Sequence, residues 1–191
     1  MRHTMSGNVK RLVFLDLETM GVLPTSSVVQ VGMLIAERVG SVLHPMVEWE
    51  YVVPYSEKEW ALAQEGAAAM HAASGLREHS VEKYGQLVRD QGWRPVLTVA
   101  TEQAIDFLSR HGFGPREAII AGNSVGQDRV WLAVQMPRLH EYLHHRMVDV
   151  SSFRVIDGMF RSAEPPSKPH TAVADCRAAM TELNAYMGRF V

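Results

Sequence analysis

The segment "VFLDLETMG" at residues 13–21 carries two carboxylates, Asp16 and Glu18, near the end of an apolar run. Such a run is typical of a buried strand, and side chains on a strand alternate between its two faces. Asp16 and Glu18 therefore share one face, with Cα atoms roughly 6.5 to 7 Å apart. Both can reach one metal site, although an isolated D-x-E pair is also what the solvated face of a half-buried strand looks like.

Three later residues could complete such a site, because two divalent cations need several oxygen ligands. Asp128 lies in "AGNSVGQDR", just after a short apolar run, where a strand-to-helix connection often carries function. Asp175 lies in "HTAVADC", five residues after His170. Five helical residues turn the chain by about 500°, so the two side chains do not share a helix face. We therefore expect His170 in the Pro-rich lead-in, pointing back at the site, although a single loop histidine is unremarkable by itself.

The elements that would position these residues follow from periodicity and from start and stop signals. Ser56 and Glu59 form a capping-box pattern at the start of the first helix, and Pro137 begins a new helical segment. The sequence predicts three consecutive antiparallel strands, two later strands, a Pro-rich loop and several helices. The strands are at 11–18, 26–37, 46–55, 117–122 and 147–150, the loop at 163–169, and the helices at 57–70, 81–92, 101–112, 127–145, 151–160 and 171–187. This order predicts an α/β fold with a mixed five-stranded sheet flanked by helices.

Composition limits the class of protein. The chain has 191 residues, of which 47% are hydrophobic and 21% charged, which fits one globular domain over 11–191 after a flexible tail at 1–10. A net charge of -2 argues against gripping long nucleic acid by charge alone. The single cysteine, Cys176, excludes an intramolecular disulfide, and we expect it to be buried. The longest apolar stretch is about half the roughly 20 residues that a membrane span requires, so we expect a cytoplasmic protein with no membrane segment.

Five blocks of the chain together resemble the oligoribonuclease branch of the DEDDh 3′-to-5′ exonucleases. They are "DLETMG", "MHAASGL", "AGNSVGQDR", "MPRLHEYLHHRMVDVSS" and "PHTAVADC", and their order and spacing match from Leu12 to Met187. The resemblance implies an RNase H-like fold and a homodimer. It also implies that two Mg²⁺ or Mn²⁺ ions are held by four carboxylates, with His170 as general base; the four are Asp16, Glu18, Asp128 and Asp175. The substrate contacts it implies are Leu17, Val22, His71, Ser124, His145, Arg146 and Ser151.

The implied reaction is removal of nucleoside 5′-monophosphates from very short RNA, including dinucleotides. By resemblance, a cap on the terminal 5′ phosphate would be formed by His71, Ser124, Arg146 and Ser151, with His145 reaching a partner subunit's site. The alternative for Arg146 is an ion pair with Glu141, and the alternative for the serines is helix capping. Adjacent helical residues diverge by ~100°, so His144 and His145 are expected in a structural or interface role rather than as metal ligands.

Two departures from the family pattern concern base binding. Val22 stands where relatives have a leucine that wedges against a base, and Gly66 falls near the position of a tryptophan that contacts bases in relatives. These departures keep open a less length-selective exonuclease acting on single-stranded DNA or RNA ends. A catalytically silent binding domain is a third reading, but its signature would be the loss of a metal ligand, and all five catalytic positions are intact.

Overall fold

The structure is a computed structural model that describes residues 9–90, 96–158 and 171–189. Five strands form one sheet in the order β3-β2-β1-β4-β5. The strands are β1 (Arg11–Thr19), β2 (Val28–Val39), β3 (Val42–Val52), β4 (Ile120–Gly122) and β5 (Met147–Asp149). The first three pair antiparallel, whereas β4 runs parallel to both β1 and β5. The predicted mixed five-stranded sheet is therefore confirmed.

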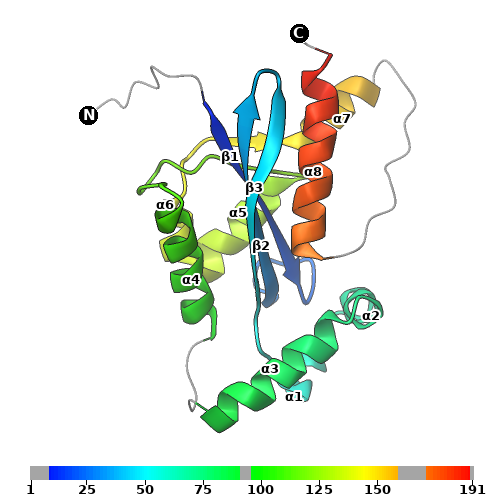
Figure 1. Ribbon diagram of the computed structural model, residues 1–191. Helices are drawn as coiled ribbons and strands as arrows, with labels where there is room; N and C mark the ends of the chain where they lie inside the picture. Colours follow the sequence, from blue (N-terminus) through cyan, green and yellow to red (C-terminus); the bar gives the residue numbers. More distant parts are fainter. Residues whose placement is uncertain (1–8, 91–95, 159–170, 190–191) are drawn as a thin grey trace.

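Helices cover both faces of this sheet (Figure 1). One face carries α4 (Val96–Arg110), α5 (Val125–Gln135) and α6 (Pro137–Tyr142), and the other carries α7 (Val150–Gly158) and α8 (Ala172–Met187). The remaining helices, α1 (Glu57–Trp60), α2 (Glu65–Ala73) and α3 (Leu76–Asp90), lie together at the end of the sheet where the arrowhead of β1 and the first turn of α8 are found. This end carries the predicted ligands Asp16, Glu18 and Asp175.

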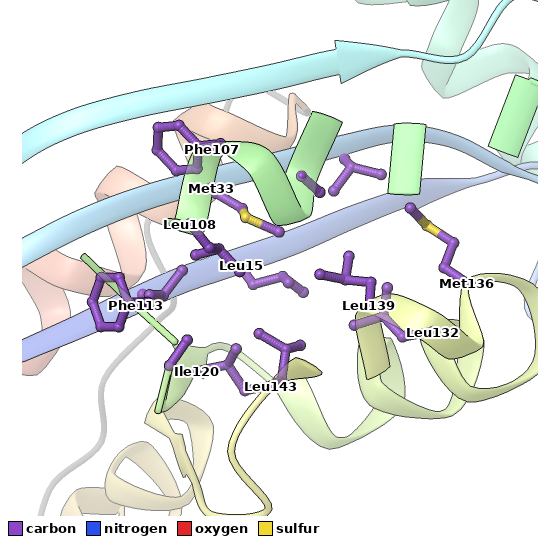
Figure 2. Close-up of a cluster of buried hydrophobic side chains, with 14 of the residues drawn as sticks. Leu15, Met33, Phe107, Leu108, Phe113, Ile120, Leu132, Met136, Leu139 and Leu143 are labelled. Carbon is purple, nitrogen blue, oxygen red and sulfur yellow. The ribbon is translucent and has the colours of Figure 1, made fainter. Parts of the chain in front are cut away.

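Alternation along β1 divides the core into two layers. Val13 and Leu15 belong to the larger cluster, which Figure 2 shows between the sheet and the helices α4, α5 and α6. Leu12 and Phe14 pack on the opposite face against α8, together with Ala179 and Leu183 among others. Asp16 and Glu18 continue the even-numbered series of β1, so the strand directs both carboxylates to the α8 face.

The hairpin between β2 and β3 differs from the sequence expectation. The chain turns at Gly40, whose φ of 63° favours glycine, and β3 begins at Val42 rather than at 46. Pro45 suggested a strand boundary, but it lies inside β3, which is an edge strand and so tolerates a residue without an N–H. The register shifts beside it, between Ile35 and Ala36 of β2.

The boundaries of several helices also differ from the sequence prediction. The capping box of Ser56 and Glu59 is present, but the predicted helix at 57–70 is two helices, because the N–H of Gln64 bonds to the carbonyl of Met20 instead of continuing α1. The next two helices begin at Leu76 and Val96, five residues earlier than expected. Pro137 does begin a new helix, but the helix ends at Tyr142, so 143–146 is not helical.

Some expectations lie outside the described residues: most of the tail at 1–10, the loop at 163–169 and His170. Over the ranges that are described, no helix combines the length and apolar character needed to cross a membrane.

Candidate active site

Three of the four predicted metal ligands converge at the end of β1. Asp16, Glu18 and Asp175 each offer an oxygen atom, and these oxygens lie within 4.8 Å of one another. Asp16 and Glu18 come from β1, and Asp175 comes from the first turn of α8. The strand alternation that predicted a shared face for Asp16 and Glu18 is consistent with this geometry.

Two residues of β2 bring α8 to this position. A Cβ atom on Gly32 would lie 2.6 Å from the backbone of Ala172, so the absence of a side chain at Gly32 allows the helix to approach the sheet. Gln30, which pairs with Glu18 in the sheet, accepts the N–H of Ala172 at 3.1 Å through its side-chain oxygen. A buried glutamine thus satisfies an N–H at the start of α8 and fixes the helix that carries Asp175.

Asp128 lies beside this group but is not part of the 4.8 Å cluster. It comes from the first turn of α5, and its Oδ1 accepts the backbone N–H of Leu17 at 3.1 Å. A cavity of about 210 Å³ adjoins it. The cavity is lined by Asp16, Leu17, Thr19, Asn123, Ser124, Gln127, Asp128 and Trp131. Leu17 therefore takes part in the site through its backbone as well as by lining the cavity.

The electrostatics of these carboxylates suit a cation. Burial, followed by repulsion from Asp175 and Asp128, raises the pKa of Glu18 from 4.5 to about 7. Burial also raises the pKa of Asp128, against the lowering effect of the Leu17 N–H, and Asp149 raises it further. Several crowded carboxylates with raised pKa values are the oxygen ligands that hard divalent cations prefer, so these residues fit such an ion.

One face of α5 holds the segment that follows β1. Asp128, Trp131 and Gln135 are spaced by three and four residues and so share a helix face. Gln135 accepts the N–H of Val28 at 3.2 Å and donates to the carbonyls of Pro24 and Ser26 at 2.8 and 2.7 Å. Sequence reasoning missed Gln135, because a single polar residue on a helix gives no signal of its distant partners.

The turn after Glu18 is tied to α2 and its approach. Val22 donates its N–H to the side chain of Gln64 at 3.1 Å, and its own side chain is 77% exposed. His71, on α2, is fully buried and donates from Nε2 to the carbonyl of Thr19 at 2.9 Å. Its Nδ1 lies 4.0 Å from the Glu18 carboxylate. The hydrogen bond to Thr19 thus holds His71 next to the carboxylate of Glu18.

Two of the predicted substrate-binding residues meet at the start of α5 and α7. The hydroxyl of Ser124 donates to that of Ser151 at 3.4 Å, and Ser124 has a left-handed backbone with φ 54° and ψ 29°. Ser124 does not cap α5 with its side chain. Asp149 accepts hydrogen bonds from both serines. Sequence reasoning did not single out Asp149, although a D-x-S pattern before a helix is an available capping signal.

The last predicted contacts lie on the segment before β5. His145 and Arg146 are both exposed, and in the described part of the chain Arg146 forms no ion pair with Glu141. The rings of His144 and His145 stack with centroids 4.2 Å apart, which corrects the expectation that they diverge, because 144–145 is not helical. Cys176 is buried as expected.

Comparison with known proteins identifies relatives over nearly the whole chain. An oligoribonuclease of Corynebacterium glutamicum is 32% identical over 186 residues, covering 94% of this chain and 80% of the relative. An oligoribonuclease of Streptomyces avermitilis is 32% identical over 183 residues, covering 92% and 84%. No family model matches. Among solved structures, the cell-death related nuclease CRN-4 superimposes with a TM-score of 0.61 at 13% identity, covering 94% of this chain and 64% of that one. The CRN-4 likeness supports the RNase H-like fold.

Proposed function

We propose a substrate and a mechanism for this chain, which belongs to the oligoribonuclease family. The chain is a 3′-to-5′ exoribonuclease that acts on short RNA, and we infer that it reduces dinucleotides and small oligoribonucleotides to nucleoside 5′-monophosphates in the cytoplasm. The observation that carries this proposal is the convergence of Asp16, Glu18 and Asp175 within 4.8 Å at the end of β1.

In this proposal two Mg²⁺ or Mn²⁺ ions are held by Asp16, Glu18, Asp128 and Asp175. When bound, such ions neutralise the phosphodiester, make a water easier to deprotonate and stabilise the departing 3′ oxygen. Asp128 is oriented by the N–H of Leu17, and Asp175 by the docking of α8 on Gly32. His170, which directly precedes Thr171 in the sequence, is proposed to take the proton of the attacking water, since an ordinary histidine pKa near ~6.5 leaves neutral imidazole at cellular pH.

Length preference is proposed to come from a cap on the terminal 5′ phosphate. Arginine offers a two-pronged donor to phosphate oxygens, and Arg146 is exposed directly before β5, the strand that leads to Ser151 at the start of α7. The side-chain contact of Ser124 with Ser151 supports this phosphate site, because it places two of the predicted contacts side by side and because the Ser124 side chain does not cap α5. His71 belongs to the same proposal; in the structure its ring is fully buried, with Nδ1 4.0 Å from the Glu18 carboxylate.

Dimerisation is part of the proposal as well. On α5, Val130 and Val134 are four residues apart and are 47% and 55% exposed, and Met147 at the start of β5 is 44% exposed. A Cβ on Gly126 would lie 3.6 Å from the end of Met147, so the two elements present one apolar surface. Such a surface suits a twofold contact that would bring His145 towards a partner's site. A fully active monomer in light scattering would contradict a required contribution from the partner.

The main experiment is a degradation time course on labelled RNA of graded length with Mg²⁺. We expect mononucleotides from a dinucleotide and from short oligomers, blocked by a 3′ phosphate on the substrate, with Asp175→Asn as the inactive matched control. Activity that persists fully in excess EDTA, or that starts from the 5′ end, would contradict the proposal.

A less length-selective exonuclease is the second candidate, and two observations favour it. Val22 is 77% exposed, and a side chain on Gly66 would meet no atom within 4 Å, so neither position shows the base clamp found in relatives. Equal rates on a dinucleotide and on a twenty-nucleotide strand would establish this alternative. The Arg146→Ala variant separates the two further: under the cap proposal it raises KM for 5′-phosphorylated dinucleotides much more than for unphosphorylated ones.

A further inference from the structure

A single carboxylate oxygen of Asp149 collects three hydrogen bonds next to the site. Its Oδ1 accepts the backbone N–H of Ser124 at 3.0 Å, the backbone N–H of Ser151 at 3.0 Å and the hydroxyl of Ser151 at 2.6 Å. Bonds to a charged acceptor are stronger than bonds between neutral groups. Asp149 therefore fixes two serines that come from different parts of the chain.

Capping of α7 explains only part of this arrangement. Asp149 directly precedes α7, so its bonds to Ser151 are those of an ordinary helix cap. The bond to Ser124 is different, because Ser124 belongs to the turn between β4 and α5 and lines the cavity beside Asp16 and Asp128. Capping of α7 does not require a hydrogen bond to the turn between β4 and α5.

The backbone of Ser124 shows why an external anchor is useful. Ser124 has a left-handed conformation, which is unfavourable for a residue other than glycine. The sheet aligns its anchor, since Asp149 pairs directly with Gly122 in the parallel β4–β5 ladder, two residues before Ser124. Asp149 accepts the backbone N–H of Ser124 and so helps to hold the residue in this conformation.

The hydroxyl groups of the two serines form hydrogen bonds of different length, which indicates different roles. The Ser151 hydroxyl donates to Asp149 over 2.6 Å, whereas the Ser124 hydroxyl donates to Ser151 over 3.4 Å, which is long for such a bond. The Ser124 proton is thus the one that can turn to a ligand at little cost. Ser151 stays bound to Asp149 and keeps the Ser124 side chain beside the cavity.

We propose that Asp149 is a positioning residue that holds the Ser124 hydroxyl, directly and through Ser151, where it can donate to the terminal 5′ phosphate of a short RNA. The proposal rests on the proposed function, because it assumes that this phosphate binds at Ser124. Asp149 itself need not touch the substrate. Its effect should therefore appear in substrate binding rather than in turnover.

The test compares Asp149→Ala with Asp149→Asn on a dinucleotide with and without a 5′ phosphate. Asp149→Ala should raise KM for the phosphorylated dinucleotide by about tenfold, leaving kcat and the unphosphorylated substrate nearly unchanged. Asp149→Asn keeps an oxygen acceptor and should stay within about threefold of the wild type. Asp106→Ala, an exposed aspartate paired with Arg110 on α4, is the control for a surface charge.

Ser124→Ala serves as a second variant, since it leaves both bonds between Asp149 and Ser151 in place and so preserves the cap of α7. It should raise KM for the phosphorylated dinucleotide but not for the unphosphorylated one, with an unchanged melting temperature. If Asp149→Ala does not fold, this variant alone tests whether the Ser124 hydroxyl binds the phosphate. Equal losses on both dinucleotides, or no change in KM in Ser124→Ala, would overturn the positioning role while the enzyme remains active. A wild-type protein that cleaves neither dinucleotide would instead overturn the proposed function.

Discussion

Replacement of Glu18 by glutamine should stabilise the metal-free protein and abolish its stabilisation by magnesium. Glu18 is buried, and its pKa of about 7 lies well above its ordinary 4.5. The causes are burial first, then Asp175 and Asp128. The Glu18→Gln side chain has nearly the same shape and carries no charge, so it removes the charge without opening a cavity.

The sign of the effect follows from linkage. The folded state binds the Glu18 proton more tightly than the unfolded state, so this residue's contribution to stability is fully present below pH ~4.5 and is lost as pH rises to about 7. At ~1.4 kcal/mol per pKa unit, a shift from 4.5 to about 7 corresponds to about 3 kcal/mol. Asp128, whose pKa is also raised, acts in the same direction.

The assay is urea unfolding followed by circular dichroism, in EDTA and in magnesium, at pH 5 and pH 8. In EDTA, the free energy of unfolding of the wild type should fall between the two pH values, and Glu18→Gln should reduce that fall by about 2.5 kcal/mol, leaving the part that is due to Asp128. Magnesium should restore the wild type at pH 8 but not the variant. Glu102→Gln, on the exposed side of α4, is the matched control.

Two results would refute the reasoning. A wild-type unfolding free energy in EDTA that is flat across this range would mean that the carboxylates are not crowded in the folded protein. A variant destabilised at pH 8 in EDTA would mean that charged Glu18 holds the fold together rather than straining it.

Three further predictions concern other parts of the site. Asp128→Asn should lower turnover of a phosphorylated dinucleotide at least a hundredfold with its circular dichroism spectrum unchanged, and near-normal activity would remove Asp128 from the metal site. Gly66→Ala should raise the free energy of unfolding by about 0.5–1 kcal/mol, because the added Cβ would meet no atom within 4 Å. Gly66→Trp should increase the ratio of the cleavage rate of a dinucleotide to that of a long strand, and an unchanged ratio would argue against base contact at this position. Gln135→Ala, which removes three hydrogen bonds to the segment after β1, should cost about 1–3 kcal/mol in urea unfolding, with exposed Ala133→Ser as the control.

The sequence predicted the parts of the fold that periodicity encodes. Alternation in β1 placed Asp16 and Glu18 on one face, and the apolar run before "NSVGQDR" placed Asp128 after a strand. The sequence could not predict where helices break for tertiary reasons, as at Gln64, whose N–H bonds to Met20. It also gave a helical reading for 143–145, where the chain instead leaves α6 in an extended conformation at Leu143.

The supporting polar contacts were the least predictable part of the site. Gln30, Gln135 and Asp149 each bond to backbone groups of other elements, at distances in sequence from two to more than a hundred residues. No local pattern reveals such partners, because the same residue types are common on solvated surfaces. Asp149 carried the one available signal, its position directly before α7 and two residues before Ser151.

The edges of the sheet determine how the molecule can meet other chains. At the β3 edge, Pro45 offers no N–H, and the register shift leaves Met46 without a partner opposite it in β2, so an incoming strand would find its ladder interrupted. At the other edge, β5 is only three residues long. Both features oppose the edge-to-edge growth that leads to aggregation, even when the protein is concentrated. Extension of the sheet is therefore a disfavoured way for two copies to associate, whereas the exposed valines on the outer face of α5 offer a side-chain surface.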